Sequence, residues 1–169
     1  EAEVFDEIRI ELTEGRIPPL RGIIHAAGVM QYEPLTSQNA QRMLEVMQVK
    51  VIGGWLLHQN FLDQPIDLFV MYSSTSSILN SPFMGAYAAA NAFLDAMAAY
   101  RRREGLSALS VSWGTWSQTG MAVEGERAAG APRSLPKGVG TISNQDGVDA
   151  LELLLRFIHH HKFACFIMF

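Results

Sequence analysis

Residues 66–103 read IDLFVMYSSTSSILNSPFMGAYAAANAFLDAMAAYRRR and divide into three parts. The largely apolar run at 66–72 predicts a strand that is buried on both faces. A cluster of hydroxyl residues follows this strand at 73–77. The alanine-rich run at 86–103 ends in three arginines before Gly105, a pattern typical of the last turn and the C-cap of a helix. Together the three parts predict a strand that leads into a helix.

The same alternation extends to both sides of this stretch. Apolar runs predict further strands at 22–29, 108–113 and 163–169. Apolar residues at helical spacing predict helices at 2–12, from Thr36 or Ser37 to 61, and at 144–159. Residues 120–141 are rich in Gly, Ala and Pro and read as a mobile loop or a short helix. Buried strands that alternate with helices predict an α/β fold, a parallel sheet flanked by helices.

The composition narrows the class of protein. The 169 residues are 49% hydrophobic and 18% charged, which suits one domain with a sizeable core. A net charge of −4 argues against a general nucleic-acid binder. The lone Cys165 excludes an internal disulfide and a cysteine-based metal site, and no apolar run reaches the roughly 18 residues of a membrane helix. We therefore expect a cytoplasmic protein with no metal, nucleic-acid or membrane partner.

Four polar residues in the middle of the chain suit proton transfer to a carbonyl group. Ser74 follows a predicted strand, and Tyr87 and Asn91 lie four residues apart on one helical face. Lys50, in the preceding predicted helix, can reach the same region. A tyrosine, with a pKa of about 10, exchanges protons poorly at neutral pH unless a cation such as a lysine stabilises the phenolate. A serine hydroxyl can hold the carbonyl oxygen of a substrate.

These residues also have plain structural interpretations. A lone tyrosine on an alanine-rich helix is more often a core or surface side chain than a catalyst. The serine cluster could merely cap the end of a strand, and no Gly-x-Ser-x-Gly pattern of a hydrolase surrounds Ser74. From the residues alone, both interpretations stay open.

Five segments in order resemble the ketoreductase domains of modular polyketide synthases, a branch of the short-chain dehydrogenase/reductase superfamily. They are HAAGV at 25–29, KVIGGW at 50–55, YSS at 72–74, YAAANAFLDA at 87–96 and WGTW at 113–116. Most of the superfamily carries Tyr-x-x-x-Lys, whereas these ketoreductases carry Tyr-x-x-x-Asn with the lysine moved upstream. Asn91 stands four residues after Tyr87, and Lys50 lies in the Lys-Val-x-Gly segment. Each motif alone is weak evidence. Together, the motifs favour the catalytic interpretation over the structural one.

The resemblance implies a Rossmann-like fold and a role for each matched residue. Tyr87 would donate a proton to the carbonyl oxygen that Ser74 holds. Lys50 would lower the pKa of the tyrosine, and Asn91 would support a proton relay. The residues expected along the cofactor, NADPH, are Ala26, Ala27, Gly28, Lys50, Tyr87, Trp113 and Gly114.

The implied reaction reduces a β-ketoacyl chain on an acyl carrier protein to a β-hydroxyacyl chain, during polyketide or related fatty-acid extension. Residues 120–143 would form a lid over the pantetheine arm of the substrate. The implied partners are the carrier protein, the upstream half of the same fold and other polyketide synthase domains.

The chain departs from the family pattern at several places. No Gly-rich phosphate loop is present, and the chain begins in the helix before the fourth strand of the family's fold. We therefore expect residues 1–169 to be one N-terminally truncated ketoreductase domain that is inactive alone, with cofactor selectivity set elsewhere. The markers of alcohol configuration, Leu-Asp-Asp and a tryptophan, are replaced by Met30-Gln31-Tyr32 and Leu79, so the configuration stays open.

Two alternatives remain from other classes. The chain could be a non-catalytic lobe for scaffolding or for docking a carrier protein. It could also be a stand-alone short-chain reductase of small ketones, although the upstream lysine argues against that role.

Overall fold

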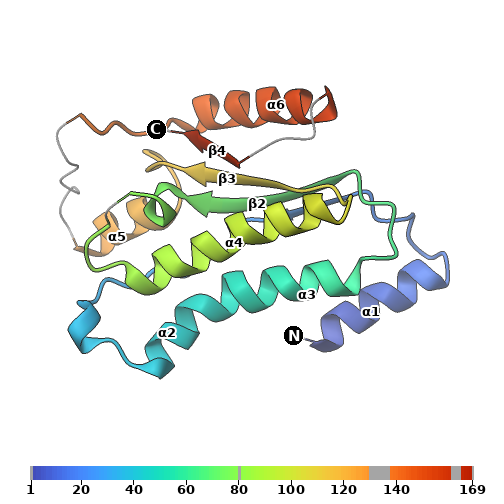
Figure 1. Cartoon of the computed structure of the whole chain (residues 1–169), viewed down its shortest axis with the longest axis horizontal. Coiled ribbons are helices and arrows are strands. Elements are labelled where there is room, and N and C mark those ends of the chain that lie inside the picture. Colours follow the sequence, from blue (N-terminus) through green and yellow to red (C-terminus); the bar gives the residue numbers. More distant parts are fainter. Residues whose placement is uncertain (1, 80, 130–137, 161–164, 169) are drawn as a thin grey trace.

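The computed structural model describes residues 2–79, 81–129, 138–160 and 165–168 (Figure 1). Its centre is a sheet of four parallel strands: β1 (Gly22–His25), β2 (Leu68–Ser74), β3 (Leu109–Trp113) and β4 (Cys165–Met168). The strands lie side by side in the order in which they follow along the chain. The α/β fold predicted from the sequence is confirmed.

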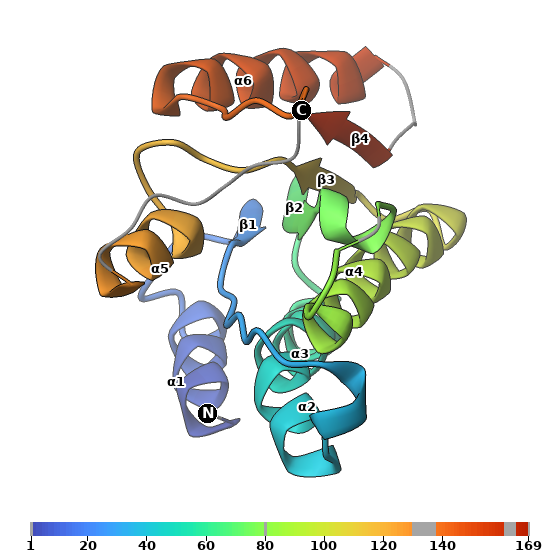
Figure 2. The same cartoon turned by 90° about the vertical axis from the view of Figure 1, so that its left-hand side faces the viewer.

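Helices cover both faces of the sheet, as Figure 2 shows. One face carries α1 (Ala2–Thr13), α2 (Ala40–Met47), α3 (Gly53–Asn60) and α4 (Gly85–Arg103), and the other carries α6 (Asn144–His160).

Strand β2 shows why the sheet is covered on both sides. Successive side chains of a strand point to opposite faces. Phe69 and Met71 pack against Leu94 of α4, whereas Val70 belongs to a second core that includes Leu154 of α6. Both faces are therefore apolar, and burying them supplies the main favourable free energy of folding.

The start of the second helix differs from the prediction. Thr36 and Ser37 lie in a 3-10 turn (Leu35–Ser37), so neither caps a long helix. Instead Asn39 caps α2, because its side-chain oxygen accepts a hydrogen bond from the backbone N–H of Arg42 at 3.1 Å. Asparagine satisfies a free backbone donor in the same way as serine or threonine. The apolar pattern therefore does not distinguish Thr36, Ser37 and Asn39 as caps.

A π turn (Gln48–Ile52) divides the single helix predicted to reach residue 61 into α2 and α3. Turns of this kind occur often at functional sites, and this one contains Lys50. Strand β2 continues two residues beyond its predicted end because Ser73 and Ser74 pair with Ser112 and Trp113 of β3.

Strand β1 forms one edge of the sheet. Among the described residues it pairs only with β2, and it ends at His25 rather than at the predicted residue 29. The side chain of Ile23 is buried in the core beneath α4, whereas that of Ile24 points to the other face and is 56% exposed. The edge is therefore both open and partly apolar.

The region expected to be a loop or a short helix contains helix α5 (Met121–Ala129). Residues 130–137 of the same region lie outside the described residues. Among the described residues, no helix is both long enough and apolar enough to cross a membrane.

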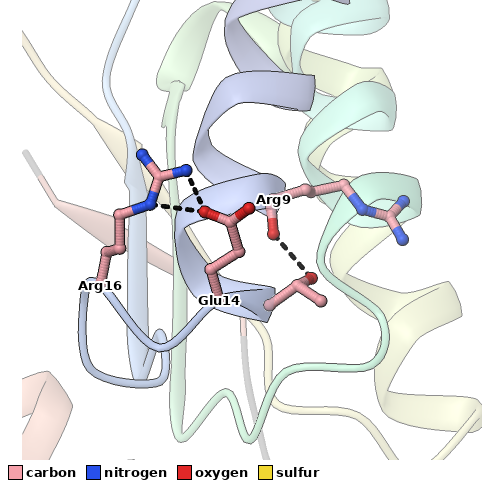
Figure 3. A network of polar contacts seen from close by, with 4 residues as sticks. Arg9, Glu14 and Arg16 are labelled. Atoms are coloured by element: carbon pink, nitrogen blue, oxygen red, sulfur yellow. Dashed lines mark hydrogen bonds and ion pairs between the residues drawn. The ribbon is translucent and has the colours of Figure 1, made fainter.

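Helix α1 ends in a small polar network on the surface, shown in Figure 3. The hydroxyl of Thr13 donates to the backbone oxygen of Arg9 at 2.8 Å, and Arg16 forms an ion pair with Glu14. Gly15 has a φ of 68°, the left-handed conformation that ends many helices. Because the ion pair is exposed, it contributes little to stability, and none of these residues lines the cavity at the sheet edge.

Candidate active site

A cavity of about 570 Å³ lies at the carboxyl ends of β1, β2 and β3. Ligands of open parallel sheets bind at this edge. The cavity brings together Ser74, Tyr87 and Lys50, three of the four predicted catalytic residues. Of the predicted cofactor residues, it is also lined by Ala26, Gly28, Trp113 and Gly114.

Ser74 is the last residue of β2 and begins the 3-10 turn that follows the strand (η3, Thr75–Ser77). Its Oγ accepts a hydrogen bond from the backbone N–H of Ser76 at 3.2 Å. The structural interpretation of this serine as a cap is thus correct. The cap uses only a lone pair of the oxygen, so the O–H can still donate to a carbonyl oxygen in the cavity.

Lys50 reaches the cavity from the π turn, and its side chain is almost wholly buried. Its Nζ donates a hydrogen bond to the backbone oxygen of Tyr72 at 2.7 Å. A Cβ on Gly28 would lie 3.0 Å from Cε of Lys50, so the glycine leaves room for the lysine. Burial lowers the pKa of Lys50 to about 8, while the negative charge of Asp95 acts in the opposite direction.

Tyr87 lies in the first turn of α4 and is buried at the cavity wall. The Nζ of Lys50 lies 5.9 Å from the centre of the tyrosine ring. A cation at this distance stabilises negative charge on the phenol more than a neutral group would. The expected effect of Lys50 on the tyrosine stays a prediction, and the geometry is suited to it.

Asn91 lies behind Tyr87 rather than in the cavity wall. Its side chain is fully buried, and its Nδ2 donates to the backbone oxygen of Tyr87 at 2.8 Å. Its Oδ1 has no hydrogen-bond partner among the described residues. Buried acceptors without a partner are rare and call for an explanation such as an ordered water, which is compatible with the predicted relay. Ala27 is likewise absent from the residues that line the cavity.

The cavity also contains residues to which no sequence motif assigns a role. Met30, Met84 and Met121 line the cavity, as does Trp116, whose ring centre lies 5.1 Å from that of Trp113. Trp116 is the last residue of the WGTW motif at 113–116, and the family resemblance implies no role for it. The methionines carry no sequence signal, because methionine is an ordinary apolar side chain that fills irregular gaps in a core.

The predicted lid contributes to the same cavity from both of its ends. Gly120, Met121 and Ala122 line it at the start of α5, and Val139 lines it beyond the residues that are not described. The lid assignment itself stays a prediction.

A parallel sheet with serine, tyrosine and lysine at its carboxyl edge defines the class of short-chain dehydrogenases and reductases. The family model of the KR domain matches residues 3–118, more than half of the chain. The chain belongs to this family, the ketoreductase domains of polyketide synthases. The family predicted from the sequence motifs is confirmed.

Curated relatives are much longer than this chain. The phenolphthiocerol synthesis polyketide synthase type I Pks15/1 of Mycobacterium marinum is 35% identical over 153 residues, which are 90% of this chain and 7% of the relative. The polyketide synthase GfsB of Streptomyces halstedii is 41% identical over 138 residues, 80% of this chain and 2% of the relative.

Solved structures agree with the family. An A1-type ketoreductase superposes with a TM-score of 0.80 at 30% identity, over 96% of this chain and 34% of that one. The ketoreductase PlmKR1 of the first module of phoslactomycin biosynthesis, from Streptomyces sp. HK803, gives a TM-score of 0.76 at 32% identity, over 89% and 34%. The chain thus spans about a third of the ketoreductases that it resembles.

Proposed function

We propose that this chain carries the proton-transfer half of a ketoreductase that uses NADPH to reduce a β-ketoacyl group, held on an acyl carrier protein, to a β-hydroxyacyl group. The observation that carries the proposal is the meeting of Ser74, Tyr87 and Lys50 in one cavity, because these groups come from three separate elements. Membership of the KR domain family supports the same reaction.

The residues of this chain act on the carbonyl oxygen of the substrate. The hydroxyl of Ser74 donates a hydrogen bond to that oxygen and fixes its position. The phenol of Tyr87 transfers its proton to the oxygen as the carbonyl carbon is reduced, which completes the alcohol. The ammonium group of Lys50 stabilises the phenolate that remains. Asn91, behind the tyrosine, supports return of a proton through a water that its free Oδ1 would hold.

NADPH supplies the hydride when it is bound. Its nicotinamide end fits the small residues Ala26, Gly28 and Gly114 at the strand ends, which let a flat ring approach the backbone closely. The buried Nε1 of Trp113, which has no partner among the described residues, is a donor beside the same edge. The solved relative with 18% identity that holds 5-hydroxy-NADP, an alcohol dehydrogenase of Thermococcus sibiricus, shares the fold alone.

The acyl chain of the substrate fits the apolar side of the cavity. Met30, Met84 and Met121 are flexible and polarisable side chains that can adapt to acyl groups of different shape. Residues 120–143 would cover the pantetheine arm. We further propose that the open edge of β1 is paired by an upstream half of the fold, which would hold the rest of the cofactor, within a polyketide synthase.

Replacement of Tyr87 by Phe tests this function. In the full-length synthase that family membership implies, Tyr87→Phe should reduce NADPH oxidation with a β-ketoacyl thioester at least 100-fold, because general acid catalysis is worth about that much or more. Tyr100→Phe is the matched control. Tyr100 lies on the same helix, packs against Trp55 and His58, and is not among the residues that line the cavity.

Two outcomes would contradict the proposal. Unchanged turnover in Tyr87→Phe would remove the tyrosine from catalysis. A folded wild-type protein that neither binds NADPH nor reduces the thioester would favour the non-catalytic lobe. That alternative has one observation behind it, because a relative 37% identical over 142 residues is named a putative inactive polyketide synthase, Pks1 of Mycobacterium tuberculosis.

A further inference from the structure

We propose that Asp95 is a positioning residue for this site: its carboxylate ties the turn after Ser74 to the buried strand β3. The inference deepens the proposed function and rests on it. Asp95 lies two helical turns beyond Tyr87 on α4 and is half-buried.

Both oxygens of the carboxylate have a serine partner. Oδ1 accepts a hydrogen bond from Oγ of Ser110 at 2.6 Å, and Oδ2 accepts one from Oγ of Ser77 at 2.8 Å. Ser110 is fully buried near the start of β3, whereas Ser77 lies in the 3-10 turn that follows β2. A carboxylate makes stronger hydrogen bonds than a neutral acceptor does. Asp95 therefore joins three elements that meet beside the cavity: α4, β3 and this turn.

The link continues from Ser77 to Ser74. Oγ of Ser77 lies 2.9 Å from the backbone oxygen of Ser74, so its single proton is shared between this oxygen and Asp95. Because Ser74 must present its own hydroxyl to the substrate, a fixed backbone at this residue fixes the position of that hydroxyl. A positional error of about 1 Å in a catalytic group can cost on the order of 100-fold in rate.

The charge of Asp95 acts on Lys50 as well. Burial lowers the pKa of Lys50, and the charge of Asp95 raises it again. Among the described residues, the groups with a printed contact to Lys50 are His25 of β1, Tyr72 of β2 and Tyr87 of α4, and none of the three is a carboxylate. Burial and the neighbouring lysine lower the pKa of His25, which favours its neutral form. The charge of Asp95 thus acts in the direction that favours the ammonium form of Lys50.

Replacement of Asp95 by Asn removes the negative charge of the side chain but keeps its shape. In the full-length chain, Asp95→Asn should lower the pKa of Lys50 by about one unit, since an opposite charge nearby shifts a pKa by about 1 to 3 units. This pKa can be measured without activity, from the pH dependence of the acylation of Lys50 by acetic anhydride, read by mass spectrometry. Asp63→Asn, at an exposed carboxylate after α3, is the control and should leave Lys50 unchanged.

Activity gives the second measurement. With the β-ketoacyl thioester, the alkaline limb of kcat should move to lower pH by about one unit in Asp95→Asn. Ser77→Ala removes the link to Ser74 but keeps the charge, so kcat should fall about 10-fold at pH 7 with no movement of the alkaline limb.

An unchanged kcat in Ser77→Ala overturns the proposal. An unchanged pKa of Lys50 in Asp95→Asn contradicts the expected effect of the charge on the lysine. If Asp95→Asn fails to fold, Ser77→Ala and Ser110→Ala still test the positioning. A wild-type protein without reductase activity contradicts the proposed function instead, and the acylation measurement still decides whether Asp95 controls Lys50.

Discussion

Lys50 is the residue at which the requirements of stability and function oppose one another. Its ammonium group is removed from water, which disfavours the charged form, yet the proposed chemistry needs that charge beside Tyr87. The π turn that carries it and the glycine at position 28 are local adjustments that make the buried position possible. Buried cations of this kind are common at active sites and rare elsewhere.

Lys50 should therefore make the stability of the protein depend on pH in the alkaline range. Its pKa is about 8 in the folded protein and 10.5 in the unfolded chain, so the unfolded chain binds more protons between these values. The free energy of unfolding should rise with pH across this window, by at most about 3 kcal/mol at 1.36 kcal/mol per unit. Below pH 8 the full cost of burial is present.

Lys50→Met tests this assignment by urea denaturation at pH 7 to 10.5. The variant should be more stable than the wild type at pH 7, and the difference should shrink as the pH rises. Parallel pH profiles for the two proteins would contradict the assignment.

At the scale of elements, the cavity wall depends on how helix α6 meets the loop after β3. Trp116 forms a parallel bridge with Ile142, and the backbone N–H of Ser117 donates to the Ile142 oxygen at 2.9 Å. The indole then lies against Gly147 in the first turn of α6, at a place where a Cβ would meet its Cη2 at 2.1 Å. Because glycine has no side chain, residue 147 leaves space for the indole of Trp116 at this position in the cavity wall.

Gly147→Ala should destabilise the protein by about 1 to 3 kcal/mol and displace the indole, because an added methyl group finds no space. Urea denaturation and the wavelength of tryptophan emission measure the two effects. Gly125→Ala is the control, since a Cβ at that helical position meets nothing within 4 Å and alanine favours a helix. Equal stability of Gly147→Ala and the wild type would show that Trp116 moves freely away from α6.

At the scale of the whole molecule, the open edge of β1 is the feature with the largest consequence for stability and association. Its backbone donors and acceptors on the outer side have no strand partner among the described residues, and Ile24 adds exposed apolar area. Unpaired edges of this kind are templates for association. The edge stands where the proposed upstream half of the fold would pair.

The chain of 169 residues in isolation should therefore unfold at low denaturant concentration or self-associate. Ile24→Lys should reduce the association, because a charge on an edge strand opposes pairing with a second chain. Sedimentation at several concentrations measures the effect, and Val4→Lys, at an exposed residue of α1, is the control. A wild-type chain that stays monomeric and unfolds only at high denaturant concentration would refute the prediction.

Much of the architecture follows from sequence patterns alone. Apolar runs without polar alternation, such as the one in β2, predict strands that must be buried on both faces, and this requirement leads directly to a parallel sheet between layers of helices. The residues proposed for proton transfer follow from the order and spacing of their motifs, and the structure brings Ser74, Tyr87 and Lys50 of this set to one cavity. Local signals were sufficient wherever the relevant partners are local.

Only the tertiary structure decided the relations between distant segments. The hydrogen bond of Lys50 to Tyr72, the network of Asp95 with Ser77 and Ser110, and the contact of Trp116 with Gly147 each join different elements of the fold. Composition and periodicity report whether a side chain prefers to be buried, but not which group it will meet. These contacts depend on strand order and on helix packing, so only the complete fold determines them.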